Sequence, residues 1–131
     1  MDVAVTRPDT RTDPVVLRLS GQLDLDTAAR LRTALDELAG ERRWKIVVDL
    51  SGLDFCDSIG LSTIVVGHRL CVAEGGWLSL AAPTPFMVRL LCAVGVADSV
   101  PVYGTVDGAR GADPADRMQP DPDGMIDDVH S

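Results

Sequence analysis

The stretch from Lys45 to Leu61, KIVVDLSGLDFCDSIGL, constrains the fold of this chain more than any other part of the sequence. It opens with a β-branched, apolar run without polar alternation, made by Ile46, Val47, Val48 and Leu50. That pattern is typical of a strand covered on both faces. Asp57 and Ser58 then stand just ahead of a long segment with helical apolar periodicity, where side-chain oxygens cap the free N–H groups of a first helical turn. The sequence therefore predicts that a buried strand delivers the Ser58 hydroxyl to a helix N-terminus. That position suits an anion, although a simple helix cap explains the same pattern.

Strands and a helix are predicted ahead of this stretch. Apolar alternation around Val3–Val5 and Val15–Leu19 predicts two strands joined as a hairpin by the polar loop 7–14, with Gly21 ending the second strand. A helix is predicted from about Thr27 to Ala39, with Asp26 as its N-cap and Gly40 beyond its end.

Two further helices and two strands are predicted after it. The helix that follows Ser58 runs to about Ala73, and a strand follows at 77–81. Thr84 then caps a third helix, which ends at Gly95, and its expected buried side consists of Phe86, Met87, Leu90, Leu91 and Val94. A last short strand at 100–103 contains Pro101, which confines it to a sheet edge.

This order of elements predicts an α/β fold with one domain, residues 1–106. Helices lie between successive later strands, and right-handed crossovers make those strands parallel. We therefore expect a mixed, mostly parallel sheet of about five strands, packed with three or more helices. Residues 107–131 are rich in Asp, Pro and Gly and carry seven Asp against two Arg, so we expect an acidic, disordered tail.

Composition excludes several classes of function. The formal net charge of −8 and the absence of a basic stripe argue against nucleic-acid binding and favour a protein partner with a basic surface. No apolar run approaches the ~20 residues that span a bilayer, and no signal peptide opens the chain, so a cytoplasmic location is expected. The three cysteines, Cys56, Cys71 and Cys92, are widely spaced in apolar surroundings, which predicts reduced core residues rather than a zinc site or a disulfide framework.

Two separated motifs resemble those of a known family. The segment VVDLSGLDFCDSIGLSTIV resembles the signature of STAS domains, in particular of small bacterial anti-sigma factor antagonists: an apolar strand, Asp-Leu-Ser, and then Asp-Ser-x-Gly-Leu opening a helix. Gly21-Gln22-Leu23-Asp24 matches a second element of that family, Gly-x-Leu-Asp before a helix. The resemblance covers roughly residues 3–106 and implies the same fold. Ile59 departs from the family pattern, which more often has Ser or Thr there, and leaves Ser58 as the only hydroxyl acceptor in the motif.

The resemblance also implies a function. An antagonist of this type binds an anti-sigma factor that has serine-kinase activity, is switched off by phosphorylation, here of Ser58, and is reset by a serine phosphatase. From the residues we expect no cofactor and no metal. The residues carried over to the partner-binding surface are Asp24, Asp57, Ser58, Ile59 and Gly60. An alternative is a STAS-type subunit or scaffold of a larger assembly, transporter-associated or part of a stress complex, without a phosphorylation cycle.

The residues do not support an enzyme. Cys56 replaces the first glycine that a Gly-x-Ser-x-Gly nucleophile elbow requires, and neither His68 nor His130 is a dependable base. No glycine-rich nucleotide-binding sequence is present. The acidic pair and the lysine that would make Asp49 a phosphoacceptor are missing, so we predict that Asp49 hydrogen-bonds the turn at Ser51.

Overall fold

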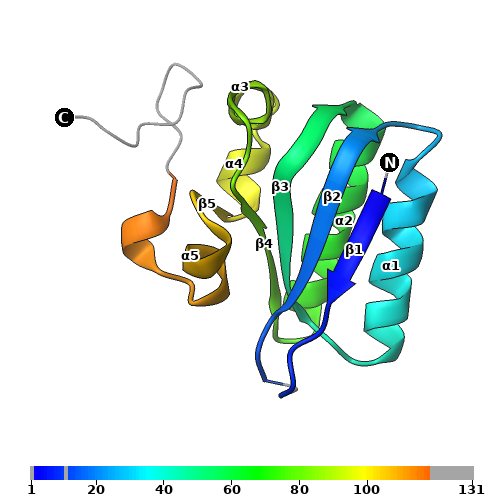
Figure 1. Cartoon of the computed structure of the whole chain (residues 1–131), viewed down its shortest axis with the longest axis vertical. Helices are drawn as coiled ribbons and strands as arrows, with labels where there is room; N and C mark the ends of the chain where they lie inside the picture. The colour runs from blue at the N-terminus through cyan, green and yellow to red at the C-terminus, as the bar shows by residue number, and fades with distance from the viewer. Residues whose placement is uncertain (1, 11, 119–131) are drawn as a thin grey trace.

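A computed structural model describes residues 2–10 and 12–118 of the chain (Figure 1). Its centre is a five-stranded sheet with the order β1-β2-β3-β4-β5. β1 pairs with β2 in the antiparallel sense, and all the later neighbours are parallel. The predicted α/β fold and mixed sheet are therefore confirmed. The strands are β1 Asp2–Thr6, β2 Val15–Leu23, β3 Lys45–Cys56, β4 Trp77–Ala81 and β5 Val102–Tyr103.

Helices cover both faces of this sheet. α1 and α2 share the main core with one face, whereas α5 packs on a smaller apolar cluster on the other. No helix in the described ranges is long and apolar enough to cross a membrane. The helices are α1 Ala28–Gly40, α2 Ser58–Ala73, α3 Pro85–Ala93, the short α4 Val96–Ser99, α5 Val106–Arg110 and the 3-10 turn η1 Pro114–Asp116.

The central strand β3 is buried on both faces, as its apolar run predicts. Ile46 and Val48 point into the main core, and the intervening Val47 points into the opposite cluster beside Ala81 and Ala109. The alternation follows from the two-residue period of a strand. β3 can therefore hold the start of α2 in a fixed place, because both of its faces are packed.

Two strands are longer than the sequence predicts. β3 continues through Ser51 and Gly52 to Cys56, and β2 continues through Gly21 to Leu23, because the two strands keep pairing across register shifts. Gly21 has φ +92, a conformation that glycine adopts without strain and that suits such an irregularity. Asp49 Oδ1 accepts a hydrogen bond from the Ser51 N–H at 2.9 Å, which confirms the prediction for Asp49.

The predicted domain boundary at residue 106 is wrong, because residues 107–118 are folded and pack on the domain. α5 and η1 fold back against β5, where the Met118 N–H donates to the Val102 carbonyl at 2.8 Å and Ala109 is fully buried (Figure 1). Small residues make this close packing possible. The Asp-, Pro- and Gly-rich composition around them predicted disorder instead of a docked segment. The rest of the predicted tail, residues 119–131, lies outside the described residues.

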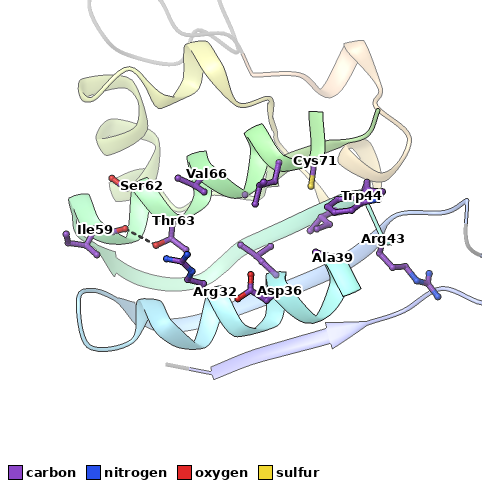
Figure 2. Close-up of a pocket in the computed structure, with 14 residues that line it drawn as sticks. Arg32, Asp36, Ala39, Arg43, Trp44, Ile59, Ser62, Thr63, Val66 and Cys71 are labelled. Carbon is purple, nitrogen blue, oxygen red and sulfur yellow. Dashed lines mark hydrogen bonds between the residues drawn. The ribbon is translucent and has the colours of Figure 1, made fainter. Parts of the chain in front are cut away.

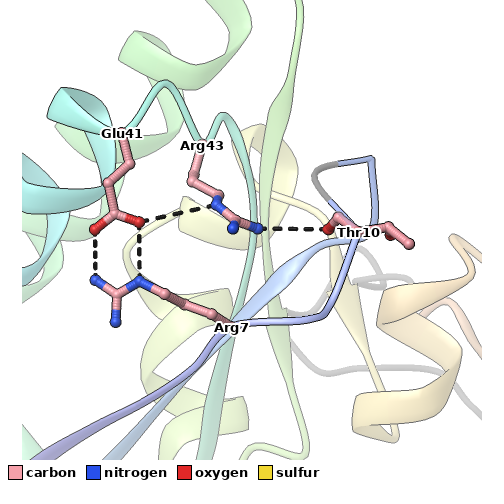
Figure 3. Close-up of polar contacts among 4 residues, drawn as sticks. All are labelled: Arg7, Thr10, Glu41 and Arg43. Atoms are coloured by element: carbon pink, nitrogen blue, oxygen red, sulfur yellow. Dashed lines mark hydrogen bonds and ion pairs between the residues drawn. The ribbon is translucent and has the colours of Figure 1, made fainter.

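A polar network ties the hairpin loop to the connector between α1 and β3 (Figure 3). Arg7 Nε and Nη2 donate to the two carboxylate oxygens of Glu41 at 2.9 and 2.6 Å. Arg43 Nε lies 3.9 Å from Glu41 Oε1, and its Nη1 donates to the Thr10 carbonyl at 3.5 Å. Arg43 thus has a structural role in joining the two loops.

Replacing Gly108 with alanine tests the docking of α5. A Cβ at Gly108 would lie 2.6 Å from the Asp116 Cβ, whereas a Cβ at Gly111 would have its nearest neighbour, the Asp107 carbonyl oxygen, at 3.7 Å. We expect Gly108→Ala to lower the free energy of unfolding by about 1–3 kcal/mol because of this overpacking. Gly111→Ala, the matched control, should change it by less than about 0.5 kcal/mol. Urea denaturation of both variants measures the difference, and equal stabilities would contradict the docking.

The cysteines give a prediction about pH. Burial, with a smaller contribution from Asp57, raises the pKa of the Cys56 thiol from 9.0 to about 12, and burial raises the pKa of Cys71 to about 11. The unfolded chain releases these protons at lower pH, so we expect the free energy of unfolding to fall as the pH rises above 9.

Iodoacetamide at pH 8 should modify half-buried Cys92 before Cys56 and Cys71, as peptide mass mapping would record. Rapid alkylation of Cys56 in the folded protein would contradict this.

Candidate partner-binding surface

The loops that follow β2, β3 and β4 emerge at one edge of the sheet, because these three strands are parallel. Leu23 and Cys56 are paired at the ends of β2 and β3. The turn containing Asp24 and the start of α2 are therefore neighbours. This is the edge at which α/β folds place their functional sites.

Asp57 holds this edge together. Its Oδ1 accepts the Gly60 N–H at 2.9 Å and so caps α2, and its Oδ2 accepts the Leu25 N–H of the neighbouring loop at 3.2 Å. Its own N–H donates to the Leu23 carbonyl at 3.0 Å. One side chain thus determines where α2 begins and how the loop after β2 lies beside it.

Asp24 builds the turn into α1. Its Oδ1 accepts hydrogen bonds from the Asp26 and Thr27 N–H groups, each at 3.1 Å, and from the Thr27 hydroxyl. The predicted N-cap, Asp26, is wrong: α1 has Thr27 at that position, and the Asp24 carboxylate organises the turn instead. Asp24 is half-buried, with a carboxylate that its own chain engages.

Ser58 is the first residue of α2 and is exposed. No described residue hydrogen-bonds to its hydroxyl, because Asp57 takes the capping role. The first N–H groups of a helix have no intrahelical partner, so those of Ser58 and Ile59 are left without one beside this hydroxyl. The arrangement presents an unencumbered nucleophilic oxygen at the positive end of a sixteen-residue helix.

Gly60 lies buried behind Ser58. A Cβ there would approach Leu23 Cγ to 2.6 Å and Cys56 Sγ to 3.0 Å, so glycine lets the start of α2 close onto the ends of β2 and β3. Gly60 is among the residues expected at the partner-binding surface, and its burial indicates a packing role there. The raised pKa of Cys56 keeps this neighbouring thiol protonated near neutral pH.

Apolar side chains at the same edge are exposed. Ile59 is 45% exposed, Leu25 69%, and the rings of Phe55 and Phe86 are stacked with centroids 6.2 Å apart while remaining about 40% exposed. The predicted burial of Phe86 and of Val94, which is 52% exposed, is wrong, because the buried side of α3 is made by Met87 and Leu91 with Leu90 partly buried. We call Leu25, Phe55, Ser58, Ile59 and Phe86 the carboxyl-edge surface.

Sequence reasoning missed Phe55 and Phe86 as members of this surface. Phe55 belongs to the irregular end of β3, where strand alternation no longer separates inside from outside. Phe86 has the apolar character of a core residue, although its place in the first turn after the Thr84 cap puts it at the sheet edge. The only signal was that Phe55 lies one residue before the end of β3 and that Phe86 lies in the first turn of the helix after β4.

The carboxyl-edge surface offers the exposed Ser58 hydroxyl, and His68 lies elsewhere in the fold. The His68 Nδ1 lies 3.0 Å from the Leu78 carbonyl oxygen, which gives this imidazole a structural partner inside the fold. Within residues 2–10 and 12–118, no cluster of three or more His, Cys, Asp or Glu side chains is placed to hold a metal ion.

Comparisons with known proteins agree with this architecture. The family model described as "Mlab, STAS domain" matches residues 6–103. An anti-sigma F factor antagonist of Paenibacillus polymyxa is 34% identical over 90 residues, which cover 68% of this chain and 77% of that protein.

Solved structures show the same fold. An anti-sigma factor antagonist from Mycobacterium paratuberculosis superposes with a TM-score of 0.75 at 27% identity, covering 85% of this chain and 92% of that one. The Bacillus cell fate determinant SpoIIAA in its phosphorylated form superposes with a TM-score of 0.64 at 23% identity, covering 85% of this chain and 98% of that one. Both the P. polymyxa protein and the M. paratuberculosis protein are named anti-sigma factor antagonists. The match to the family model and the identity to the P. polymyxa protein establish that this chain belongs to the STAS domain family.

Proposed function

We propose that this protein is an anti-sigma factor antagonist whose binding is switched off by phosphorylation of Ser58. Its partner is an anti-sigma factor with serine-kinase activity, and a serine phosphatase resets the switch. The observation that carries the proposal is the free, exposed Ser58 hydroxyl at the start of α2, beside a residue that already caps the helix. The names of the relatives support the antagonist role.

Ser58 is chemically suited to accept a phosphoryl group. Its hydroxyl can enter a kinase active site without breaking a hydrogen bond to any described residue. Ile59 is the adjoining exposed residue, and the side-chain hydroxyls further along α2 are engaged: those of Ser62 and Thr63 donate to the carbonyls of residues 58 and 59 at 2.9 and 3.1 Å. These bonds favour Ser58 over its neighbours as the acceptor.

The phosphate changes binding through charge. It would add about −1.5 to −2 charges at the centre of the carboxyl-edge surface, close to the carboxylate of Asp57. The start of α2 tolerates that charge in the free protein, because the free N–H groups and the helix dipole face it. An anti-sigma factor that covers the exposed apolar side chains Leu25, Phe55 and Phe86 would have to desolvate the charge, so the complex is weakened.

The alternative of a subunit without a phosphorylation cycle predicts that Ser58 is only a helix-end residue. The geometry favours the phosphorylation cycle, because a residue needed only as a cap would donate or accept a capping bond. Asp57 performs that task.

The Ser58 switch can be tested with three variants. We expect Ser58→Ala to bind the anti-sigma factor as tightly as wild type and Ser58→Asp to bind at least about tenfold more weakly, because a buried charge costs more than a lost hydroxyl. Thr33→Asp adds the same charge to exposed α1 and should leave affinity unchanged. Calorimetry measures all three. Equal affinity of Ser58→Asp and wild type would refute the charge mechanism.

Phosphorylation itself can be read by intact mass. Incubation with the anti-sigma factor and ATP should add one phosphate to wild type and none to Ser58→Ala. A phosphate on both proteins would place the acceptor elsewhere, and none on either would favour the subunit without a cycle.

Asp24→Asn separates a structural carboxylate from a functional one. Asparagine keeps the Oδ1 acceptor of the turn and removes the charge, so stability should stay within about 1 kcal/mol of wild type. We predict slower Ser58 phosphorylation or weaker partner binding in this variant, because Asp24 lies beside the start of α2 on the face offered to the kinase. Asp26→Asn, a neighbouring exposed change, serves as the control for net charge. Lost stability with unaltered phosphorylation and binding would make Asp24 purely structural.

A further inference from the structure

A cavity of about 230 Å³ lies between α1 and α2 (Figure 2). Buried Ile46 and Cys71 and half-buried Leu35 form part of its wall, and Trp44 lines the end farther from Ser58. Ile59, from the carboxyl-edge surface, lines the other end. The volume falls below the roughly 300–1,000 Å³ of sites for drug-sized ligands, so a slender ligand suits it better than a bulky one.

The outward side of α2 beside this cavity is apolar. Ile59, Val66 and Leu70 follow at helical spacing and are 45–53% exposed. The opposite side of α2, with buried Leu61 and Ile64, packs into the core. A helix that is apolar on both sides is normally covered, and a hollow lined by such side chains gains little from water and more from an apolar guest.

Few polar groups lining the cavity are available to a ligand. The Ser62 and Thr63 hydroxyls donate to carbonyls of their own helix. Arg43 contacts the Glu41 carboxylate and donates to the Thr10 carbonyl. Arg32 differs, because its guanidinium forms no hydrogen bond or ion pair with any described residue. Figure 2 shows this side chain extending from α1 toward α2 next to Thr63.

The electrostatics of the cavity differ between its ends. Arg32 and Thr63 lie toward the end where α2 begins, so the positive pole of the helix dipole adds to the arginine charge there. Asp36, the acidic residue that lines the cavity, lies one turn further along α1. A guanidinium binds a carboxylate through two parallel N–H bonds, which favours an anion at the Arg32 end.

From this arrangement we propose that the cavity binds a single-chain carboxylate amphiphile of the medium-chain fatty acid class. The alkyl chain lies along Leu35, Ile46 and Trp44, and the carboxylate pairs with Arg32 at the mouth. Association is non-covalent. The proposal does not depend on the phosphorylation of Ser58.

Dodecanoate below its micelle concentration is the probe. Calorimetry on the full chain should show saturable binding to one site, and Arg32→Gln should weaken it about fivefold to tenfold, the loss of one charge-assisted interaction. Asp36→Asn should leave binding unchanged or strengthen it. Arg69→Gln makes the same charge change on an exposed part of α2 outside the cavity and should have no effect.

Two further measurements locate the ligand. The change in tryptophan emission on adding dodecanoate should persist in Trp77→Phe and vanish in Trp44→Phe, and Ala39→Phe should block binding by filling the cavity. Dodecylammonium should bind more weakly than dodecanoate. Absence of saturable dodecanoate binding, unchanged affinity in Arg32→Gln, or tighter binding of dodecylammonium would each overturn the proposal. Should Ala39→Phe fail to fold, the exposed Arg32→Gln change still decides it.

Discussion

The Asp57 carboxylate is the interaction on which the rest of this edge depends. One oxygen caps α2 through the Gly60 N–H, and the other holds the Leu25 N–H of the adjacent loop. A charge-assisted bond of this kind is stronger than a neutral one, and here two bonds share one side chain. Because Asp57 takes the capping role, Ser58 is released from it and can carry a modification without loss of the helix start.

The packed sheet makes that arrangement rigid. β3 is covered on both faces, and the buried Gly60 allows α2 to sit directly on the ends of β2 and β3. A phosphate added at Ser58 therefore meets a preformed helix terminus. The exposed aromatic pair and Leu25 lie on the same edge, so the proposed phosphorylation would change the charge where a partner would bury apolar surface.

The fold could be predicted from the sequence because its signals are local. An apolar, β-branched run without polar alternation marked β3, and Thr84 with Pro85 marked the start of α3. The family motif led to Ser58, and the parallel strand order brought the loop of Asp24 beside it. These inferences need only periodicity, capping chemistry and chain direction.

The missed features depend on contacts between distant residues. Ser51 and Gly52 resemble a turn in sequence, yet pairing with β2 keeps them in a strand. The Asp116 side chain accepts bonds from the Thr105 N–H and hydroxyl, and this contact docks a segment whose composition suggested disorder. The apolar cavity likewise arises from the spacing of two helices, which no single motif encodes.

Amide hydrogen exchange at Gly60, compared between the unmodified protein and protein carrying phosphoserine at position 58, tests the central claim most directly. Asp57 protects this amide, and the claim is that phosphorylation alters surface charge while the helix start stays intact. Equal protection of Gly60 in the two forms, with chemical-shift changes confined to the loops after β2 and β3 and the first turn of α2, is the predicted result. Loss of protection at Gly60, or shifts spreading through the buried core, would contradict it.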